Sequence, residues 1–322
     1  MATAAATLPP PLPAIRRVHH WQERLAQGLL VACCAALALF LFAPLFMILV
    51  KSVQDKDGAF VGLLQFQQYF ETPALRQSIA NTLWIAFAVT TITVPLAFAY
   101  AYALTRSCMP WRGFFRVIAL TPILAPSLLS AISFIQWFGT QGLLKGLLGG
   151  ASIYGPIGII LSSIYATFPH ALMIVLTALL LSDGRLYEAA ESLRTPTWRK
   201  FFTITLPGAK YGLVSAAMVV FSYTVSDFGI PKVIGGNFNV LALDIFKQVI
   251  GQQNFNKGAV VSLILLVPVF VAFIVDWIMQ GRLQSQFSSR AVPYAPKPKR
   301  WFDAAMHQLG WIEGRNLTVE RG

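Results

Sequence analysis

The chain has 322 residues, of which 56% are hydrophobic and only 12% are charged, and its formal net charge is +12. Soluble domains carry roughly 25% charged residues, so this composition excludes an ordinary soluble domain. The apolar residues are concentrated in uncharged runs longer than the ~20 residues that cross a bilayer as a helix. Since these runs do not alternate apolar and polar residues, as barrel strands do, we predict an all-α membrane protein.

In chain order, residues 1–26 are expected to be a disordered cytoplasmic N-terminus, because residues 2–13 are rich in alanine and proline. The first apolar run is too long for a signal peptide and is interpreted as a retained anchor. A six-span domain is predicted over residues 27–280. Its spans are expected at 27–50, 79–105, 117–138, 156–181, 211–230 and 259–277.

Prolines occur inside most of these runs, and span three carries two of them, Pro122 and Pro126. Proline frees a backbone carbonyl and kinks a helix, which membrane helices tolerate where neighbours satisfy the freed group. Kinked spans are therefore expected.

Most of the 25 lysine and arginine residues lie in the N-terminus, in the loops after spans two and four, and in the tail 281–322. The positive-inside rule places these four regions in the cytoplasm. Because the charge follows membrane sidedness, it indicates contact with anionic lipid and gives no indication of nucleic-acid binding.

The loop at 182–210 is predicted to hold two short helices. Ser182 or Asp183 caps the first, whose apolar stripe is Leu186, Ala189, Ala190 and Leu193. Pro196 is expected at the first position of the second helix, and Pro207-Gly208 at its end. A polar two-turn helix of this kind is expected to dock on something outside the membrane.

Glu188-Ala189-Ala190 and Ile204-Thr205-Leu206-Pro207 resemble, in type and spacing, the cytoplasmic loop of bacterial ABC-importer permeases. The family has glycine where this chain has Arg194. Glycine suits a left-handed turn at a helix end, and another residue there costs roughly 1 kcal/mol. Either the turn differs here or coupling is impaired.

The resemblance, which covers roughly residues 27–280, implies a six-helix permease of the type I importer kind in the bacterial inner membrane. It implies three partners: a cytoplasmic ATPase dimer, a periplasmic solute-binding protein, and a second permease half that is either a second copy or a homologous subunit. It assigns ATPase coupling to Glu188, Ala189, Ala190, Arg194, Ile204, Leu206 and Pro207.

A narrower resemblance, to permeases for 2-aminoethylphosphonate, lies in residues 226–236 and 252–255. It implies a small phosphonate as substrate, with iron(III), thiamine and polyamine importers as alternatives. A secondary transporter or channel is a further alternative. So is an inactive truncated half-permease, because residues 309–316 resemble a segment of an unrelated solute-binding protein family and the tail is either native or aberrant.

The chain has no G-x-x-x-x-G-K-[ST] motif, so ATP hydrolysis is expected on a separate subunit, and no catalytic residue, cofactor or metal site is predicted. Ionisable residues inside spans are costly and are often functional. The candidates for a substrate path are His170, Ser222, Tyr223, Ser226 and Asp227. The favoured alternatives are a hydrogen bond of neutral His170 across the bundle and a helix-end pairing of Asp227 with Lys232.

Overall fold

The computed structural model describes residues 21–107 and 109–286, with the side chains of Glu23 and of residues 282–286 excepted. Within these ranges the secondary structure is helical, apart from one isolated antiparallel bridge between Gln54 and Phe60. The predictions for residues 1–20 and for the tail beyond residue 286 fall outside the described residues. The longer helices are α1 (Trp21–Ser52), α3 (Pro73–Arg106), α5 (Ser127–Phe138), α6 (Pro156–Leu180), α9 (Leu206–Ser226) and α12 (Phe255–Gln286).

Shorter elements connect these helices. They are α2 (Leu64–Glu71), α4 (Arg112–Leu120), α7 (Gly184–Ser192), α8 (Thr197–Lys200), α10 (Gly229–Ile234) and α11 (Leu241–Phe246). Two 3₁₀ turns, η1 (Thr121–Leu124) and η2 (Lys145–Leu148), and two π-helical segments, η3 (Phe201–Thr205) and η4 (Lys247–Gly251), complete the set.

Five helical stretches are long and apolar enough to cross a membrane: 24–52, 73–106, 156–180, 197–226 and 255–281. A sixth candidate is the pair Arg112–Leu124 and Ser127–Phe138, which is bent by 105° at the break. The described chain is therefore a multi-pass helical membrane protein with five or six candidate spans.

The break in the third predicted span lies at its prolines. Ala125 is extended (φ −92°, ψ 129°), as expected of a residue that precedes proline, and Pro126 forms the N-cap of α5. Pro95, Pro169 and Pro268 instead lie inside α3, α6 and α12, which continue through them. In the described part of the chain, proline therefore coincides with a sharp break of a candidate span at Pro126, whereas these other helices continue through their prolines.

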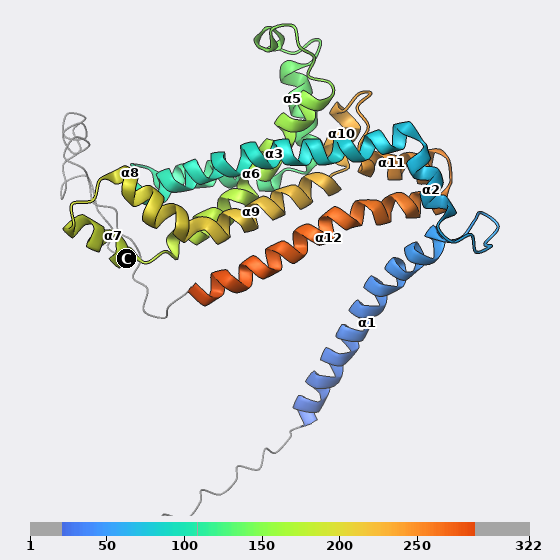
Figure 1. Cartoon of the computed structure of the whole chain (residues 1–322), viewed down its shortest axis with the longest axis horizontal. Helices are drawn as coiled ribbons and strands as arrows, with labels where there is room; N and C mark the ends of the chain where they lie inside the picture. Colours follow the sequence, from blue (N-terminus) through green and yellow to red (C-terminus); the bar gives the residue numbers. More distant parts are fainter. Residues whose placement is uncertain (1–20, 108, 287–322) are drawn as a thin grey trace, which may run out of the picture. The chain divides into compact units, whose positions relative to one another are not determined.

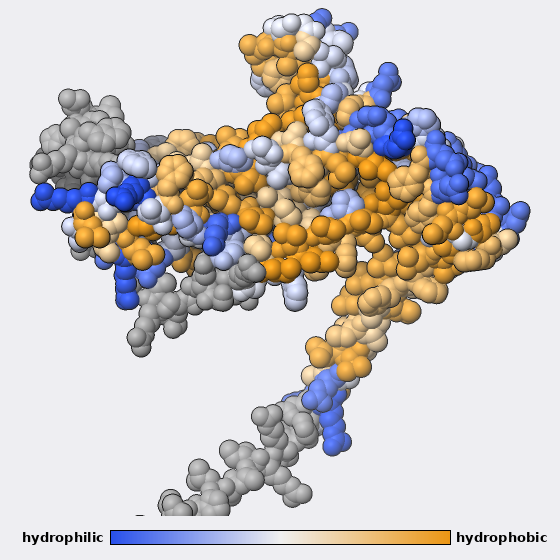
Figure 2. Space-filling model, in the orientation of Figure 1, coloured by the Kyte–Doolittle hydropathy of each residue, from blue (hydrophilic) through white to orange (hydrophobic). Residues whose placement is uncertain are grey.

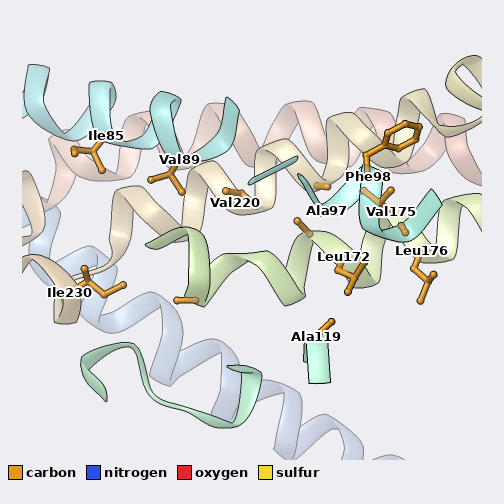
Figure 3. Packing of buried hydrophobic residues seen from close by; sticks show 14 of the residues in the cluster. Ile85, Val89, Ala97, Phe98, Ala119, Leu172, Val175, Leu176, Val220 and Ile230 are labelled. Carbon is orange, nitrogen blue, oxygen red and sulfur yellow. The ribbon is translucent and has the colours of Figure 1, made fainter. Parts of the chain in front are cut away.

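Four long helices lie side by side in the part of the chain from Lys51 onward: α6 packs on α3, both pack on α9, and α9 packs on α12 (Figure 1). Buried residues of α3, α6 and α9 form the main core, among them Val89, Val175 and Val220 (Figure 3). Gly212 permits the close approach of α9 to α6, because a Cβ at this position would lie 2.3 Å from the Cβ of Ala178.

The connecting loops meet at the two ends of this bundle. At one end Asn81 Nδ2 donates to the Asn239 carbonyl (2.9 Å), and Asn256 Nδ2 donates to the Lys51 carbonyl (3.0 Å). At the other end Arg106 donates to the Leu179 carbonyl (2.8 Å). Hydrophilic residues gather around α7 and α8 and around α2, with apolar surface between (Figure 2). Such a band between polar ends is typical of a bilayer-spanning bundle.

Residues 21–50 of α1 belong to a separate compact unit and are described by themselves. Their most apolar window is entirely exposed within this unit. A long helix whose apolar side chains are not buried matches the predicted first span, because lipid covers such a surface in a membrane.

Candidate functional site

The first helix of the 182–210 loop begins where the sequence predicts. Asp183 is the N-cap of α7, and its Oδ1 accepts the Arg185 backbone N–H (3.0 Å). This bond satisfies one of the donors that a helix start leaves unpaired. The local sequence therefore determines the start of α7.

The end of α7 is a Schellman turn that contains Arg194. The N–H of Arg194 bonds to the Glu191 carbonyl (2.9 Å) and that of Thr195 bonds to the Ala190 carbonyl (2.9 Å), which is the hydrogen-bond pattern of this motif. Arg194 has φ +50°. The left-handed turn that a glycine would favour is therefore retained here, with arginine in its place.

One side of α7 is buried against the bundle. Gly184, Tyr187 and Ala190 lie on this side. The Tyr187 hydroxyl is hydrogen-bonded to Thr205 Oγ1 (2.8 Å), and both residues are at most 5% exposed. The Arg106 guanidinium lies 4.5 Å from the Tyr187 ring centroid. The predicted stripe is divided: Ala190 is buried with Tyr187, whereas its other members are exposed.

The sequence interpretation missed Tyr187, Thr205 and the contact of Arg106. Tyr187 is adjacent to Glu188 in the chain, yet nothing in its local pattern shows that its hydroxyl has a buried partner. Arg106 was counted only as part of the positive charge after span two. These contacts join segments about 18 to 80 residues apart, so the local sequence pattern cannot predict them.

The outward side of α7 carries exposed apolar residues. Leu186 is 57% exposed and Leu193 is 80% exposed, and on the following segment Trp198 and Phe202 are 68% and 59% exposed. Large exposed apolar side chains are a feature of interaction surfaces. We call these four residues the apolar face of the 182–210 loop.

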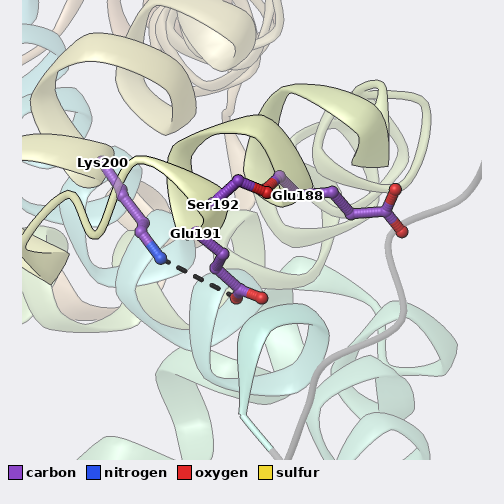
Figure 4. Close-up of polar contacts among 4 residues, drawn as sticks. All are labelled: Glu188, Glu191, Ser192 and Lys200. Carbon is purple, nitrogen blue, oxygen red and sulfur yellow. Dashed lines mark hydrogen bonds and ion pairs between the residues drawn. The ribbon is translucent and has the colours of Figure 1, made fainter.

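The acidic residues of α7 differ in their contacts. Glu191 pairs with Lys200 (3.7 Å), whereas the exposed side chain of Glu188 points away from that pair (Figure 4). The exposed Ala189 follows Glu188, and its short side chain leaves space beside the Glu188 carboxylate. A carboxylate and a small residue beside an apolar face suit the docking of a protein with a basic group.

The second half of the loop differs from the expectation. Pro196 is the N-cap of α8 instead of its first residue, and the helix does not end at Pro207-Gly208. The π-helical η3 connects α8 to α9 without a break, and Pro207 lies in the first turn of α9. Proline lacks the N–H that an α-helix would use here, and a π-helical turn absorbs the mismatch. Ile204 is half-buried and Leu206 packs against the main core.

Among the predicted path residues, His170 contacts Tyr223, and Ser226 contacts Ser222. The His170 ring of α6 lies 5.4 Å from the Tyr223 ring of α9, and His170 Nδ1 is 3.2 Å from the Ala166 carbonyl of its own helix. Ser226 Oγ donates to the Ser222 carbonyl (2.7 Å), also within one helix. The expected hydrogen bond of His170 across the bundle is therefore replaced by a ring contact.

Asp227 is a turn residue. Its carboxylate accepts the backbone N–H groups of Gly229 (3.3 Å) and Ile230 (3.1 Å) at the start of α10. The expected pairing with Lys232 is not made, because the Lys232 ammonium lies over the Phe246 ring at 4.4 Å. The helix-end role is present, with backbone partners instead of lysine.

One further buried carboxylate, Asp244, lies on α11, at the end of the bundle that is far from the 182–210 loop (Figure 1). It is 3% exposed and accepts a hydrogen bond from Ser78. Burial raises the pKa of the Asp244 carboxyl, and the Ser78 hydrogen bond and the charge of Lys247 offset this in part. In the described part of the chain no group of three or more His, Cys, Asp or Glu residues is placed to hold a metal ion.

Comparison with known proteins identifies a family. The family described as "Binding-protein-dependent transport system inner membrane component" matches residues 94–284, which is more than half of the chain. The chain is 25% identical over 258 residues to the putative ferric transport system permease protein FbpB 1 of Haemophilus influenzae, covering 77% of this chain and 40% of that protein. It spans 31% of the similar FbpB of Actinobacillus pleuropneumoniae.

Another relative is similar over most of its own length. The putative 2-aminoethylphosphonate transport system permease protein PhnU of Salmonella typhi is 26% identical over 242 residues, which are 72% of this chain and 83% of that protein. Among solved structures, a bacterial ABC transporter that imports alginate has a chain with a TM-score of 0.64 at 14% identity, covering 83% of this chain and 97% of that one. The structural likeness is in the fold.

Proposed function

This chain belongs to the family of inner membrane components of binding-protein-dependent transport systems, and we propose that it is the non-catalytic permease subunit of an ATP-driven importer. A separate cytoplasmic ATPase dimer would hydrolyse ATP. A solute-binding protein would deliver the substrate from outside. Type I importer geometry, with six spans, is part of the same proposal.

The observation that carries the proposal is the outward surface of α7. Exposed Leu186 and Leu193, the exposed Glu188 and the Schellman turn at Arg194 together give a short, capped helix with an exposed outward side. The buried side is occupied by Tyr187 and Ala190, so the helix is held against the bundle while its other side stays open. We assign ATPase coupling to this surface, with Ile204, Leu206 and Pro207 connecting it to α9.

The test of this assignment is charge reversal at Glu188. Glu188→Lys should abolish co-purification with the ATPase and ATP-driven uptake, because it places a cation against the basic group expected on the partner. The matched control is Glu71→Lys, an exposed glutamate on α2 at the other end of the bundle, which should leave ATPase binding unchanged. Unchanged binding and uptake in Glu188→Lys would refute the assignment.

We propose that both termini and the 182–210 loop lie in the cytoplasm. The basic residues of this loop and the exposed arginine Arg116 on α4 support this orientation under the positive-inside rule. Two exposed positions outside the proposed docking surface test it in a variant that lacks the native cysteines. In intact cells an impermeant maleimide should label Leu143→Cys and should label Arg116→Cys only after permeabilisation. The reverse pattern would invert the topology.

For the substrate we propose a small phosphonate such as 2-aminoethylphosphonate. The similarity to PhnU over 83% of its length supports this choice, while the similarity to FbpB supports iron(III) as the second candidate. The proposed path runs past His170, Tyr223 and Asp227, and Ser222 and Ser226 lie on the same part of α9. Uptake of labelled 2-aminoethylphosphonate, with iron(III) in parallel, decides between the two, and Tyr223→Phe should raise KM for the true substrate.

One six-span half leaves the path open on one side, so we propose that a second half completes it. This second half is either another copy of the chain or a homologous subunit. Native mass spectrometry of the purified transporter distinguishes these two possibilities. A complex with two copies of this chain contains twice the mass of the chain, whereas a complex with a homologous subunit contains one copy and a chain of different mass. A complex that contains one permease chain and is active in uptake would contradict the proposal.

A further inference from the structure

The side chain of Arg106 lies where three helices of the bundle meet the 182–210 loop. Arg106 is the last residue of α3 and is partly buried. Its Nη2 donates to the Leu179 carbonyl at the end of α6 (2.8 Å) and to the Ser182 hydroxyl. A cation at the carbonyl end of a helix interacts favourably with the helix dipole. The hydrogen bonds of Arg106 therefore tie α3 to the end of α6.

The same guanidinium contacts α7 through an aromatic ring. Its central carbon lies 4.5 Å from the Tyr187 ring centroid, within the range of a cation–π contact. The Tyr187 hydroxyl in turn bonds to Thr205 Oγ1 (2.8 Å) in η3, which leads directly into α9. Arg106 and Tyr187 thus connect α7 to α3, α6 and the start of α9.

The contacts among Arg106, Tyr187 and Thr205 involve polar groups, although Tyr187 and Thr205 are buried. Tyr187 is 5% exposed and Thr205 is 2% exposed, so neither can exchange its partner for water without opening the loop. A buried polar group that loses its partner is destabilised, which favours one discrete arrangement of α7 over a range of them. A force on α7 would therefore move α3 and α9 with it.

We propose that Arg106 is the positioning residue that passes movement of α7 to α3 and α6 during transport. This inference rests on the proposed role of α7 in ATPase docking. The guanidinium carbon lies over the Tyr187 ring while Nη2 donates to the Leu179 carbonyl and the Ser182 hydroxyl. The ammonium of lysine cannot make both contacts in this geometry.

The experiment uses the complete transporter with its ATPase and binding protein in proteoliposomes. Substrate uptake and ATP hydrolysis are measured together, and their ratio is the readout. In Arg106→Gln we expect ATPase co-purification to remain at the wild-type level and uptake per ATP to fall by about tenfold. Arg106→Lys should recover only part of the ratio, and Arg116→Gln, which removes an exposed arginine on α4, should leave it unchanged.

A double-mutant cycle with Tyr187→Leu, which removes the ring, tests the contact itself. If Arg106 acts through Tyr187, the double variant should be no worse than the poorer single variant. Equal uptake per ATP in wild type and Arg106→Gln would overturn the inference while leaving the docking proposal intact. Loss of ATPase binding in Arg106→Gln would also overturn it, since Arg106 would then be needed for assembly. Failure of wild type to bind any ATPase would refute the proposed function instead.

Discussion

Arg194 offers the sharpest test of how this sequence forms its docking helix. The residue is exposed and stands at φ +50° in the Schellman turn that ends α7. Arg194→Gly should strengthen this turn, because glycine adopts the left-handed conformation without steric conflict between Cβ and the following carbonyl. The two hydrogen bonds of the turn use backbone atoms and persist in the variant.

The size of the effect follows from two opposing quantities. The left-handed conformation costs a non-glycine residue about 1–2 kcal/mol. Glycine gives back about 0.4–1 kcal/mol because its unfolded backbone has more freedom. A net gain of about 0.5–1 kcal/mol remains, which corresponds to about a two- to fivefold shift toward the formed turn.

The shift is measurable as hydrogen exchange of peptides that cover residues 186–200, in detergent or nanodiscs. After correction for intrinsic rates, the amides of residues 194 and 195 should exchange about two to five times more slowly in Arg194→Gly. Arg194→Ala is the matched control. It removes the same charge from the end of the helix but keeps a Cβ in the left-handed conformation, so it should give no gain. Equal protection in the two variants would refute the backbone explanation.

Three further predictions concern the bundle, and thermal unfolding in detergent measures each of them. Gly212→Ala should destabilise the protein by about 1–3 kcal/mol, because the new Cβ would lie 2.3 Å from that of Ala178. The control Gly208→Ala should be neutral or stabilising, because the nearest neighbour of its new Cβ is 3.9 Å away. Equal effects of the two substitutions would contradict the packing argument. Asn256→Ala should cost about 1–3 kcal/mol, because the two hydrogens of Nδ2 are shared among three backbone carbonyls, and Asn256→Asp should cost more, since an ionised carboxylate cannot donate. Burial raises the pKa of Asp244 above 3.8, so the stability linked to its protonation is present below that pH and is lost as pH rises through the folded-state pKa. Asp244→Asn should flatten this decline, and a variant with the wild-type pH dependence would show that another group causes it.

Much of the architecture is readable from the sequence because it depends on local properties. Uncharged apolar runs require helices long enough to cross a membrane, and the candidate spans lie where those runs occur. Asp183 caps α7, since capping depends on a few neighbouring residues, and the resemblance to the permease loop marks Arg194 as the residue in a glycine position.

Other features depend on contacts between distant segments, and only the tertiary structure decides them. Pro122 and Pro126 indicate a bend, but the 105° angle between the two halves of the third span depends on what each half packs against. Asp227 accepts backbone N–H groups at the start of α10, while its expected partner Lys232 lies over Phe246. Charge pairing inferred from proximity in sequence does not account for such competing partners.

The same distinction applies to the 182–210 loop. The sequence predicts a short helix capped by Asp183 at the start of this loop and a docking partner for it, but it does not predict that the second helix continues into α9. The tertiary structure decided which side of α7 is free, turning Ala190 inward and leaving Leu186 and Leu193 exposed. Helix formation and capping depend on interactions within a few residues, whereas the orientation of α7 depends on contacts with Arg106 and Thr205, which are far away in the chain.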